Sequence, residues 1–135
     1  MPPFLLQITI PLLLGLFHFI GPVPADLGAD GGQLSPCASP AHCASATWQV
    51  ADSSVALEKL SEVIKTTPRT EIITQRDDYL HATYSSRIFG FVDDLELAAN
   101  DDVTLEARSI SRLGESDLGV NAQRLENLSQ SLDIQ

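Results

Sequence analysis

Residues 91–109 read FVDDLELAANDDVTLEARS, and this stretch decides the fold. Mostly apolar or small side chains recur at every second position on both sides of a polar centre, as expected for two half-buried β-strands. The positions that share the apolar face are Phe91, Asp93, Leu95 and Leu97 in the first run and Val103, Leu105, Ala107 and Ser109 in the second. We therefore predict an antiparallel hairpin with Ala98 to Asp102 as its loop.

The register of this hairpin is predicted from its apolar face. Leu97 should lie opposite Val103, because a slip of one residue would turn one strand inside out. That register places Asp94 opposite Glu106, and two like charges that face each other are unfavourable. We therefore expect Arg108 to lie among these carboxylates.

A calcium site built from Asp94, Glu96 and Glu106 is the alternative, although strand carboxylates lack the looped carbonyl geometry that such sites use. Asp93 raises a separate question, since it falls on the apolar face. A carboxylate there must be paired, because burying a lone charge is very costly. Its available partners are Ser109, Ser111 or an arginine further along the chain.

Outside this hairpin the sequence predicts a second hairpin and two helices. Helical spacing of leucines predicts a helix from Ser54 to Lys65, capped by Asp52 or a following serine. Thr70 to Gln75 and Tyr79 to Ser85 read as the other hairpin, and a last helix should start near Asn121. The expected fold is α+β: a small antiparallel sheet of about four strands with an N-terminal and a C-terminal amphipathic helix, in one domain over residues 51–135.

The N-terminal part reads as a leader and an arm. Residues 1–25 contain no charged side chain, and Phe4 to Ile20 is nearly all apolar. Small or short residues before Asp26 favour a cleaved signal peptide, with an uncleaved membrane anchor as the alternative. Residues 26–50 are rich in Gly, Pro and Ser and predict an irregular arm. In an exported chain, Cys37 and Cys43 favour a disulfide over a metal site with His42.

Charge and motifs limit the function. The chain carries 18 acidic and 8 basic residues, a formal net charge of −10, which makes nucleic acid an unfavourable partner. It has no nucleophile elbow, no paired-histidine zinc motif and no phosphate-binding loop, so the sequence leans against an enzyme and predicts no cofactor and no metal.

The segment from Arg108 to Arg124 gathers three of the eight basic residues with hydroxyl and amide groups. Arg124 falls in the first turn of the last helix, where a base is unfavourable without a partner carboxylate or a bound anion. The candidate binding residues are Asp93, Asp94, Arg108, Ser109, Ser111, Arg112, Asp117, Asn121 and Arg124.

Three motifs resemble the family catalogued as "domain of unknown function 1499". They are Leu34-x-Pro36-Cys37 with Cys43, the run Phe89-Gly90-Phe91-Val92-Asp93-Asp94-x-Glu96, and Arg108-Ser109-x-Ser111-Arg112-x-Gly114-x-Ser116-Asp117-x-Gly119-x-Asn121-x-x-Arg124. The resemblance covers about residues 28–132. It implies an exported setting, namely secreted, periplasmic or in the thylakoid lumen, and it implies no activity.

Three functional hypotheses follow. The first is a non-catalytic binding or assembly module that uses the Arg108–Arg124 surface for a partner protein or a small anionic ligand. The second is that this motif only holds strand, turn and helix together. The third is a small hydrolase-like enzyme that uses Asp93 with Arg112 and Arg124. A membrane would be involved only through the N-terminal segment, if that segment is not cleaved.

Overall fold

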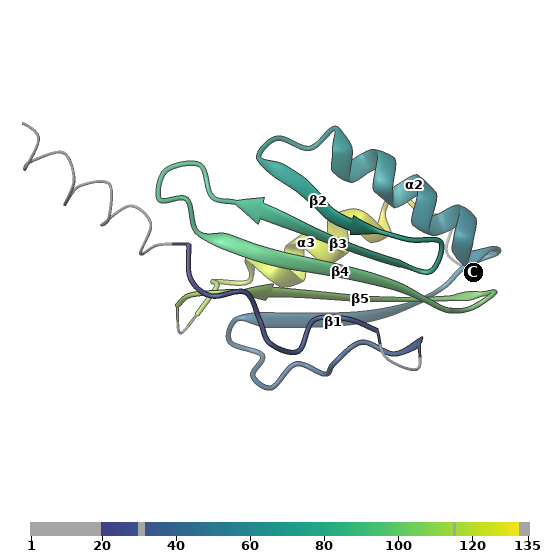
Figure 1. Ribbon diagram of the computed structural model, residues 1–135, viewed down its shortest axis with the longest axis horizontal. Helices are drawn as coiled ribbons and strands as arrows, with labels where there is room; N and C mark the ends of the chain where they lie inside the picture. Colours follow the sequence, from purple (N-terminus) through teal and green to yellow (C-terminus); the bar gives the residue numbers. More distant parts are fainter. Residues whose placement is uncertain (1–19, 30–31, 115, 133–135) are drawn as a thin grey trace, which may run out of the picture.

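The computed structural model describes residues 20–29, 32–114 and 116–132, and its centre is one antiparallel sheet (Figure 1). The strands lie in the order β1-β5-β4-β3-β2. Their bounds are Cys43–Gln49 for β1, Thr70–Gln75 for β2, Tyr79–Ser85 for β3, Val92–Asp101 for β4 and Thr104–Ser111 for β5. The central strands β5, β4 and β3 therefore lie between the two edge strands.

The two helices in the described part of the chain lie on the same face of this sheet (Figure 1). Helix α2, Ser53–Lys65, packs on β2 to β5, and α3, Val120–Ser129, packs on β1 and β5. The apolar face of the sheet and the buried faces of the helices form one core, which includes Leu60, Leu95 and Leu105, all without exposed surface. Burial of this apolar area is the main stabilising contribution to the fold.

The α+β class with an antiparallel sheet is confirmed, but the predicted strand count and helix placement are wrong. The fifth strand, β1, lies within residues 26–50, which were expected to be irregular. As a consequence α2 is not an N-terminal helix, because it follows the first strand of the sheet. The sequence of β1 is CASATWQ, and its small side chains give a weak alternation of apolar and polar positions.

The hairpin of β4 and β5 forms as predicted, but its register is wrong. Leu97 lies opposite Ala107 and not opposite Val103, so β4 continues to Asp101 and the turn is tight. The Asp101 carboxylate accepts a hydrogen bond from the amide of Val103 across this turn, at 2.9 Å. The like-charge pair of Asp94 and Glu106 therefore does not occur.

The predictions of α2 and of the β2–β3 hairpin, which rest on local sequence signals, are confirmed. Asp52 caps α2, because its carboxylate accepts hydrogen bonds from the amides of Ser54 and Val55. The predicted start of the last helix is confirmed, because α3 begins at Val120, but Asn121 was expected to cap it and the N-cap is Gly119. Asn121 lies inside the first turn with no exposed surface. Gly119 has a φ of 83°, a left-handed conformation that favours glycine.

The other face of the sheet is covered by residues 20–29 and 32–36, and from here on these residues alone are called the arm (Figure 1). The Gly28 amide donates to Glu96, and the Leu34 amide donates to Glu106. Gly21 lies so close to β5's end that a Cβ atom there would be 2.7 Å from Cγ of Leu113. Most of the predicted leader, residues 1–19, lies outside the described residues. Within those that are described, neither helix is long and apolar enough to cross a membrane.

Candidate functional site

The Arg108–Arg124 motif is divided between the two faces of the sheet. Successive side chains of a strand point to opposite faces, so Arg108 contacts the arm side while Ser109 contacts α3. Arg112, directly after β5, also lies on the arm side, where it pairs with Asp94, and Arg124 lies in α3. The motif therefore forms two separate polar clusters, one beneath the arm and one beneath the start of α3.

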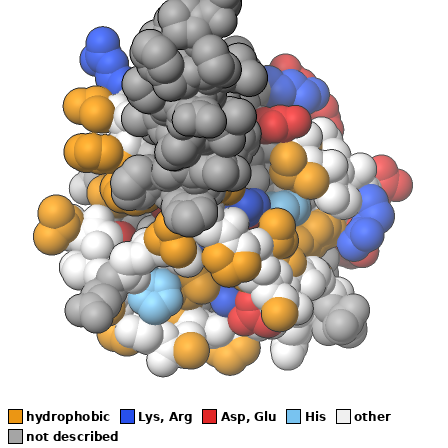
Figure 2. All heavy atoms as spheres, turned by 60° about the vertical axis from the view of Figure 1, so that its left-hand side comes forward, with side chains coloured by type: hydrophobic (Ala, Val, Ile, Leu, Met, Phe, Trp, Pro, Cys, Tyr) orange, Lys and Arg blue, Asp and Glu red, His pale blue; other side chains and the backbone are white. Residues whose placement is uncertain are grey.

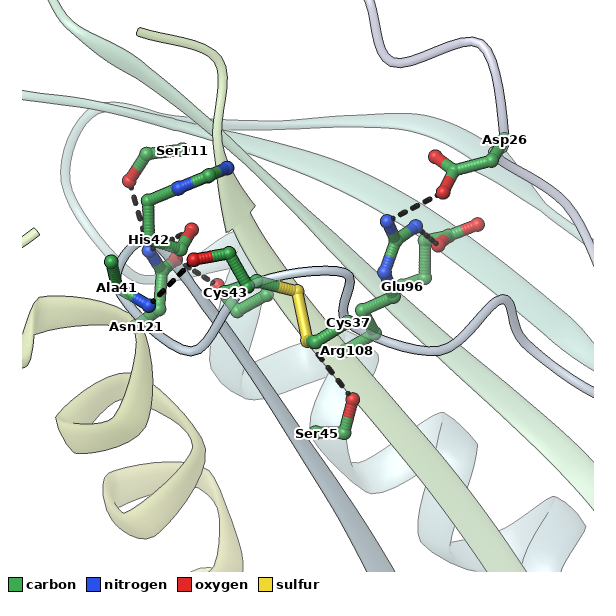
Figure 3. Close-up of a disulfide and its surroundings, with 12 residues drawn as sticks. Asp26, Cys37, Ala41, His42, Cys43, Ser45, Glu96, Arg108, Ser111 and Asn121 are labelled. Atoms are coloured by element: carbon green, nitrogen blue, oxygen red, sulfur yellow. Dashed lines mark hydrogen bonds and ion pairs between the residues drawn. A yellow bond between two sulfur atoms is a disulfide. The ribbon is translucent and has the colours of Figure 1, made fainter. Parts of the chain in front are cut away.

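The first part of the arm-side cluster centres on Glu96 and Arg108, which lie opposite each other in β4 and β5. Arg108 Nη1 lies 3.2 Å from Glu96 Oε2, and Nη2 lies 2.8 Å from Asp26 Oδ2 of the arm (Figure 3). The Tyr79 hydroxyl donates to Glu96 Oε1 at 2.6 Å. Burial and this bond to Glu96 raise the pKa of Tyr79, so the hydroxyl keeps its proton.

The second part of the arm-side cluster is a charged pair with a histidine. Arg112 Nε and Nη2 donate to the two carboxylate oxygens of Asp94 at 2.8 and 3.0 Å, and His81 Nε2 lies 2.7 Å from Asp94 Oδ1. Burial alone would raise the pKa of Asp94, but the hydrogen bonds with His81 and Arg112 outweigh it and lower that pKa. The Asp94 side chain is therefore an ionised, fully buried carboxylate with both oxygens occupied.

The α3-side cluster is organised by Asn121. Its side-chain amide donates to Ser111 at 2.8 Å and to Asp117 at 2.7 Å, and its oxygen accepts from Ser109 at 2.7 Å. The same amide also donates to the His42 carbonyl, as Figure 3 shows beside the disulfide. These contacts join β5, the loop before β1 and the start of α3. Asn121 therefore holds three segments together instead of capping the helix.

Arg124 completes the α3-side cluster. Its Nη2 lies 2.9 Å from Asp93 Oδ2, and its Nη1 donates to Ser109 at 3.0 Å and to Asn121 at 2.9 Å. The guanidinium carbon lies 4.3 Å from the ring centroid of Tyr84, which is a cation–π contact. Of the partners expected for Asp93, the structure has an arginine, Arg124, and this pairing explains how a base is tolerated near the N-terminal end of α3.

A groove opens beside Arg124, between the end of α2 and the start of α3. It consists of two cavities of about 380 and 630 Å³ that share Thr67, Tyr84, Val120 and Arg124. We call it the α2–α3 groove. Its further apolar lining residues are Val63, Pro68, Phe91, Leu113, Leu118 and Leu128, and its further polar ones are Arg69, Ser85, Ser86, Asp93, Ser111, Ser116, Asp117, Gln123 and Asn127. Apolar atoms make up most of the exposed surface of the groove, and the α3-side cluster borders it.

Several candidate residues are brought together, but not as one site. Asp93, Ser109, Ser111, Asp117, Asn121 and Arg124 form the α3-side cluster, whereas Asp94, Arg108 and Arg112 lie on the arm side. The set proposed for a hydrolase is thereby divided, since Asp93 pairs with Arg124 and Arg112 pairs with Asp94. The sequence interpretation did not include Asp26, Tyr84, Tyr79 or His81 among the candidate residues. Tyr79 and His81 are two residues apart on β3 and therefore point to the same face, which was the available signal.

The carboxylates of the suggested calcium site are engaged elsewhere. Asp94 is bound to Arg112, Glu96 to Arg108, and Glu106 to the amide of Leu34. Within the part of the chain that the structure describes, no three His, Cys, Asp or Glu side chains are grouped so that they could hold a metal ion. Cys37 and Cys43 form the expected disulfide, which closes the loop before β1 (Figure 3).

Comparison with known proteins gives a family and no function. The family model described as "Protein of unknown function (DUF1499)" matches residues 32–132, which include all five strands, both helices and all nine candidate binding residues. None of the curated proteins compared with the chain matches it. The chain belongs to the DUF1499 family.

Proposed function

We propose that this protein is an exported, non-catalytic binding module that holds an apolar segment of a partner protein in the α2–α3 groove. The Arg108–Arg124 motif has a structural role in this proposal, because it fixes the floor and one end of the groove. The observation that carries the proposal is Leu118. This residue is 92% exposed at the groove and has a φ of 53°, in the left-handed region.

Both the positive φ and the exposure of Leu118 are unfavourable for the stability of the folded chain. A leucine with positive φ costs about 1 kcal/mol or more relative to right-handed backbone, and its exposed side chain gains nothing from burial. Unusual backbone conformations of this kind occur most often where a chain binds something. Val120, 48% exposed, lies beside it and lines both cavities of the groove. A partner that covers both side chains would offset this cost.

The charges favour an apolar partner over a small anionic ligand. Two arginines line the groove: Arg69 donates to the Ser85 carbonyl, and the charge of Arg124 is already paired with Asp93. Arg112 is paired with Asp94 on the other face of the sheet. An anion would have to compete with Asp93 for Arg124 or with Asp94 for Arg112, which is costly. An apolar segment needs no such exchange and gains from the exposed leucine and valine.

The groove is tested by photo-crosslinking in the cells that make the protein. A photo-reactive amino acid replaces Val120 or, as a control at the opposite end of the sheet, Val103, whose exposure of 47% is nearly equal. We expect a discrete cross-linked protein from position 120 and none from position 103. Leu118→Asp should abolish that product. Equal labelling from both positions, or no product from position 120, would refute the proposed function.

A further inference from the structure

The loop between β3 and β4 exposes large apolar side chains at one end of the molecule. Ile88 is 82% exposed and Phe89 is 58% exposed, and the Phe89 and Phe91 rings lie 5.5 Å apart. Phe91 and Leu113 line the same cavity, so the β3–β4 loop and the segment after β5 are neighbours. We call Arg87, Ile88, Phe89, Phe91 and Leu113 the tip. Figure 2 shows hydrophobic side chains gathered on this side of the molecule.

The charge of the tip is opposite to that of the chain as a whole. Residues 79–92 contain no Asp or Glu, although the formal net charge is −10. Arg87 is exposed next to Ile88, and Arg69 borders the same cavity as Phe91 and Leu113. A negatively charged surface would attract the tip and repel most of the remaining domain. Such a surface would therefore orient the molecule with the tip towards it.

The position of the N-terminal end of the described chain indicates what kind of surface this is. Gly21 lies against Leu113 of the tip, and the residues that precede it, Phe4 to Ile20, are nearly all apolar. The described chain begins at the same end of the molecule as the β3–β4 loop (Figure 1). An apolar run of this length suits a lipid bilayer, and aromatic side chains with a neighbouring arginine suit its interfacial layer.

We propose that the tip rests in the interfacial layer of an anionic bilayer while the chain still carries its apolar leader Phe4–Ile20, either before cleavage or as the retained membrane anchor that the sequence gives as the alternative. The tip then acts as a second contact, which fixes the orientation of the domain on the membrane. Ile88 and Phe89 enter the headgroup region, and Arg87 is attracted by the net negative charge of the anionic lipids. The tip shares Phe91 and Leu113 with the groove, but the residues that enter the headgroup region, Ile88 and Phe89, do not line it.

The experiment uses the full chain reconstituted in vesicles that contain brominated lipids, which quench nearby tryptophan. Phe89→Trp places a reporter in the tip, and Val103→Trp places a matched reporter at the opposite end of the sheet. The native Trp48 is buried and common to both variants. We expect several-fold stronger quenching for Phe89→Trp than for Val103→Trp. Equal and weak quenching in both variants would overturn the proposal.

Further variants separate the tip from the apolar run and from the groove. In the Phe89→Trp background, Arg87→Glu should reduce quenching in phosphatidylglycerol vesicles and leave it unchanged in phosphatidylcholine vesicles. Leu118→Asp should leave quenching unchanged while it abolishes cross-linking from position 120 in the groove. A loss of quenching with Leu118→Asp would show that the groove, and not the tip, contacts the lipid, and would overturn the inference alone.

Discussion

Replacement of Arg112 by Gln tests whether the buried pair on the arm side is part of the fold. The Asp94 side chain has no exposed surface and that of Arg112 is 10% exposed, so the pair lies almost wholly out of water. Removing one partner of a buried pair costs about 3–5 kcal/mol, because the other charge is left buried. His81 remains bound to Asp94, which places the expected cost for Arg112→Gln at the lower end, about 3 kcal/mol.

This cost can be measured by equilibrium unfolding in urea with the disulfide intact. For a domain of this size, about 3 kcal/mol corresponds to a fall in Tm of roughly 10–20 °C. The double variant Arg112→Gln with Asp94→Asn should recover part of the loss, since no charge is then left unpaired.

Lys65→Gln provides the control. Lys65 and Glu62 form an exposed pair with side-chain exposures of 49% and 63%, so its loss should change the free energy of unfolding by less than about 0.5 kcal/mol. If Arg112→Gln is as mild as this control, the buried pair is not structural, and the interpretation of the arm-side cluster must be abandoned.

Three further predictions concern the same clusters. Folding lowers the pKa of Asp94 below its ordinary value of 3.8. The stability that the ionised Asp94 contributes is therefore complete above pH 3.8 and is lost as the pH falls through the folded-state pKa. Urea midpoints measured from about pH 5 to about pH 2 should fall less in Asp94→Asn than in the wild type. Reduction of the Cys37–Cys43 disulfide should cost about 2 kcal/mol by urea unfolding, because the closed loop is short; a much larger loss would contradict this. Asn121→Ala should cost about 3 kcal/mol, since it leaves several buried groups unpaired, and a loss below about 1 kcal/mol would contradict its role in joining three segments.

The predictions from sequence succeeded where the signal is local. The cap at Asp52 and the helical spacing after it identify α2, and β-branched residues identify β2. The register of β4 and β5 was not determined by its apolar pattern. Pairing Leu97 with Val103 or with Ala107 keeps the same faces together, since the two registers differ by an even number of residues. The tight turn closed by Asp101 decides between them, and that signal is weak in the sequence.

The candidate site was predicted as a set of residues but not as an arrangement. The polar residues from Arg108 to Arg124 were identified, and the pairing of Asp93 with an arginine was expected. Their division between two faces follows from strand alternation, yet the partners come from segments far away in the sequence. Asp26 lies 82 residues before Arg108, and nothing in the sequence around Asp26 indicates that the two residues pair. The groove depends on the placement of α2 and α3, which no motif encodes.

The contacts of the arm determine what proteolytic processing would change. A cut between Ala25 and Asp26 would leave both the Asp26 carboxylate with Arg108 and the Gly28 amide with Glu96 on the mature chain. Only contacts before the cut, such as that of Gly21 with Leu113, would be removed. Processing at this position would therefore remove the proposed membrane anchor and keep the two hydrogen-bonded contacts through which Asp26 and Gly28 hold the arm to the sheet.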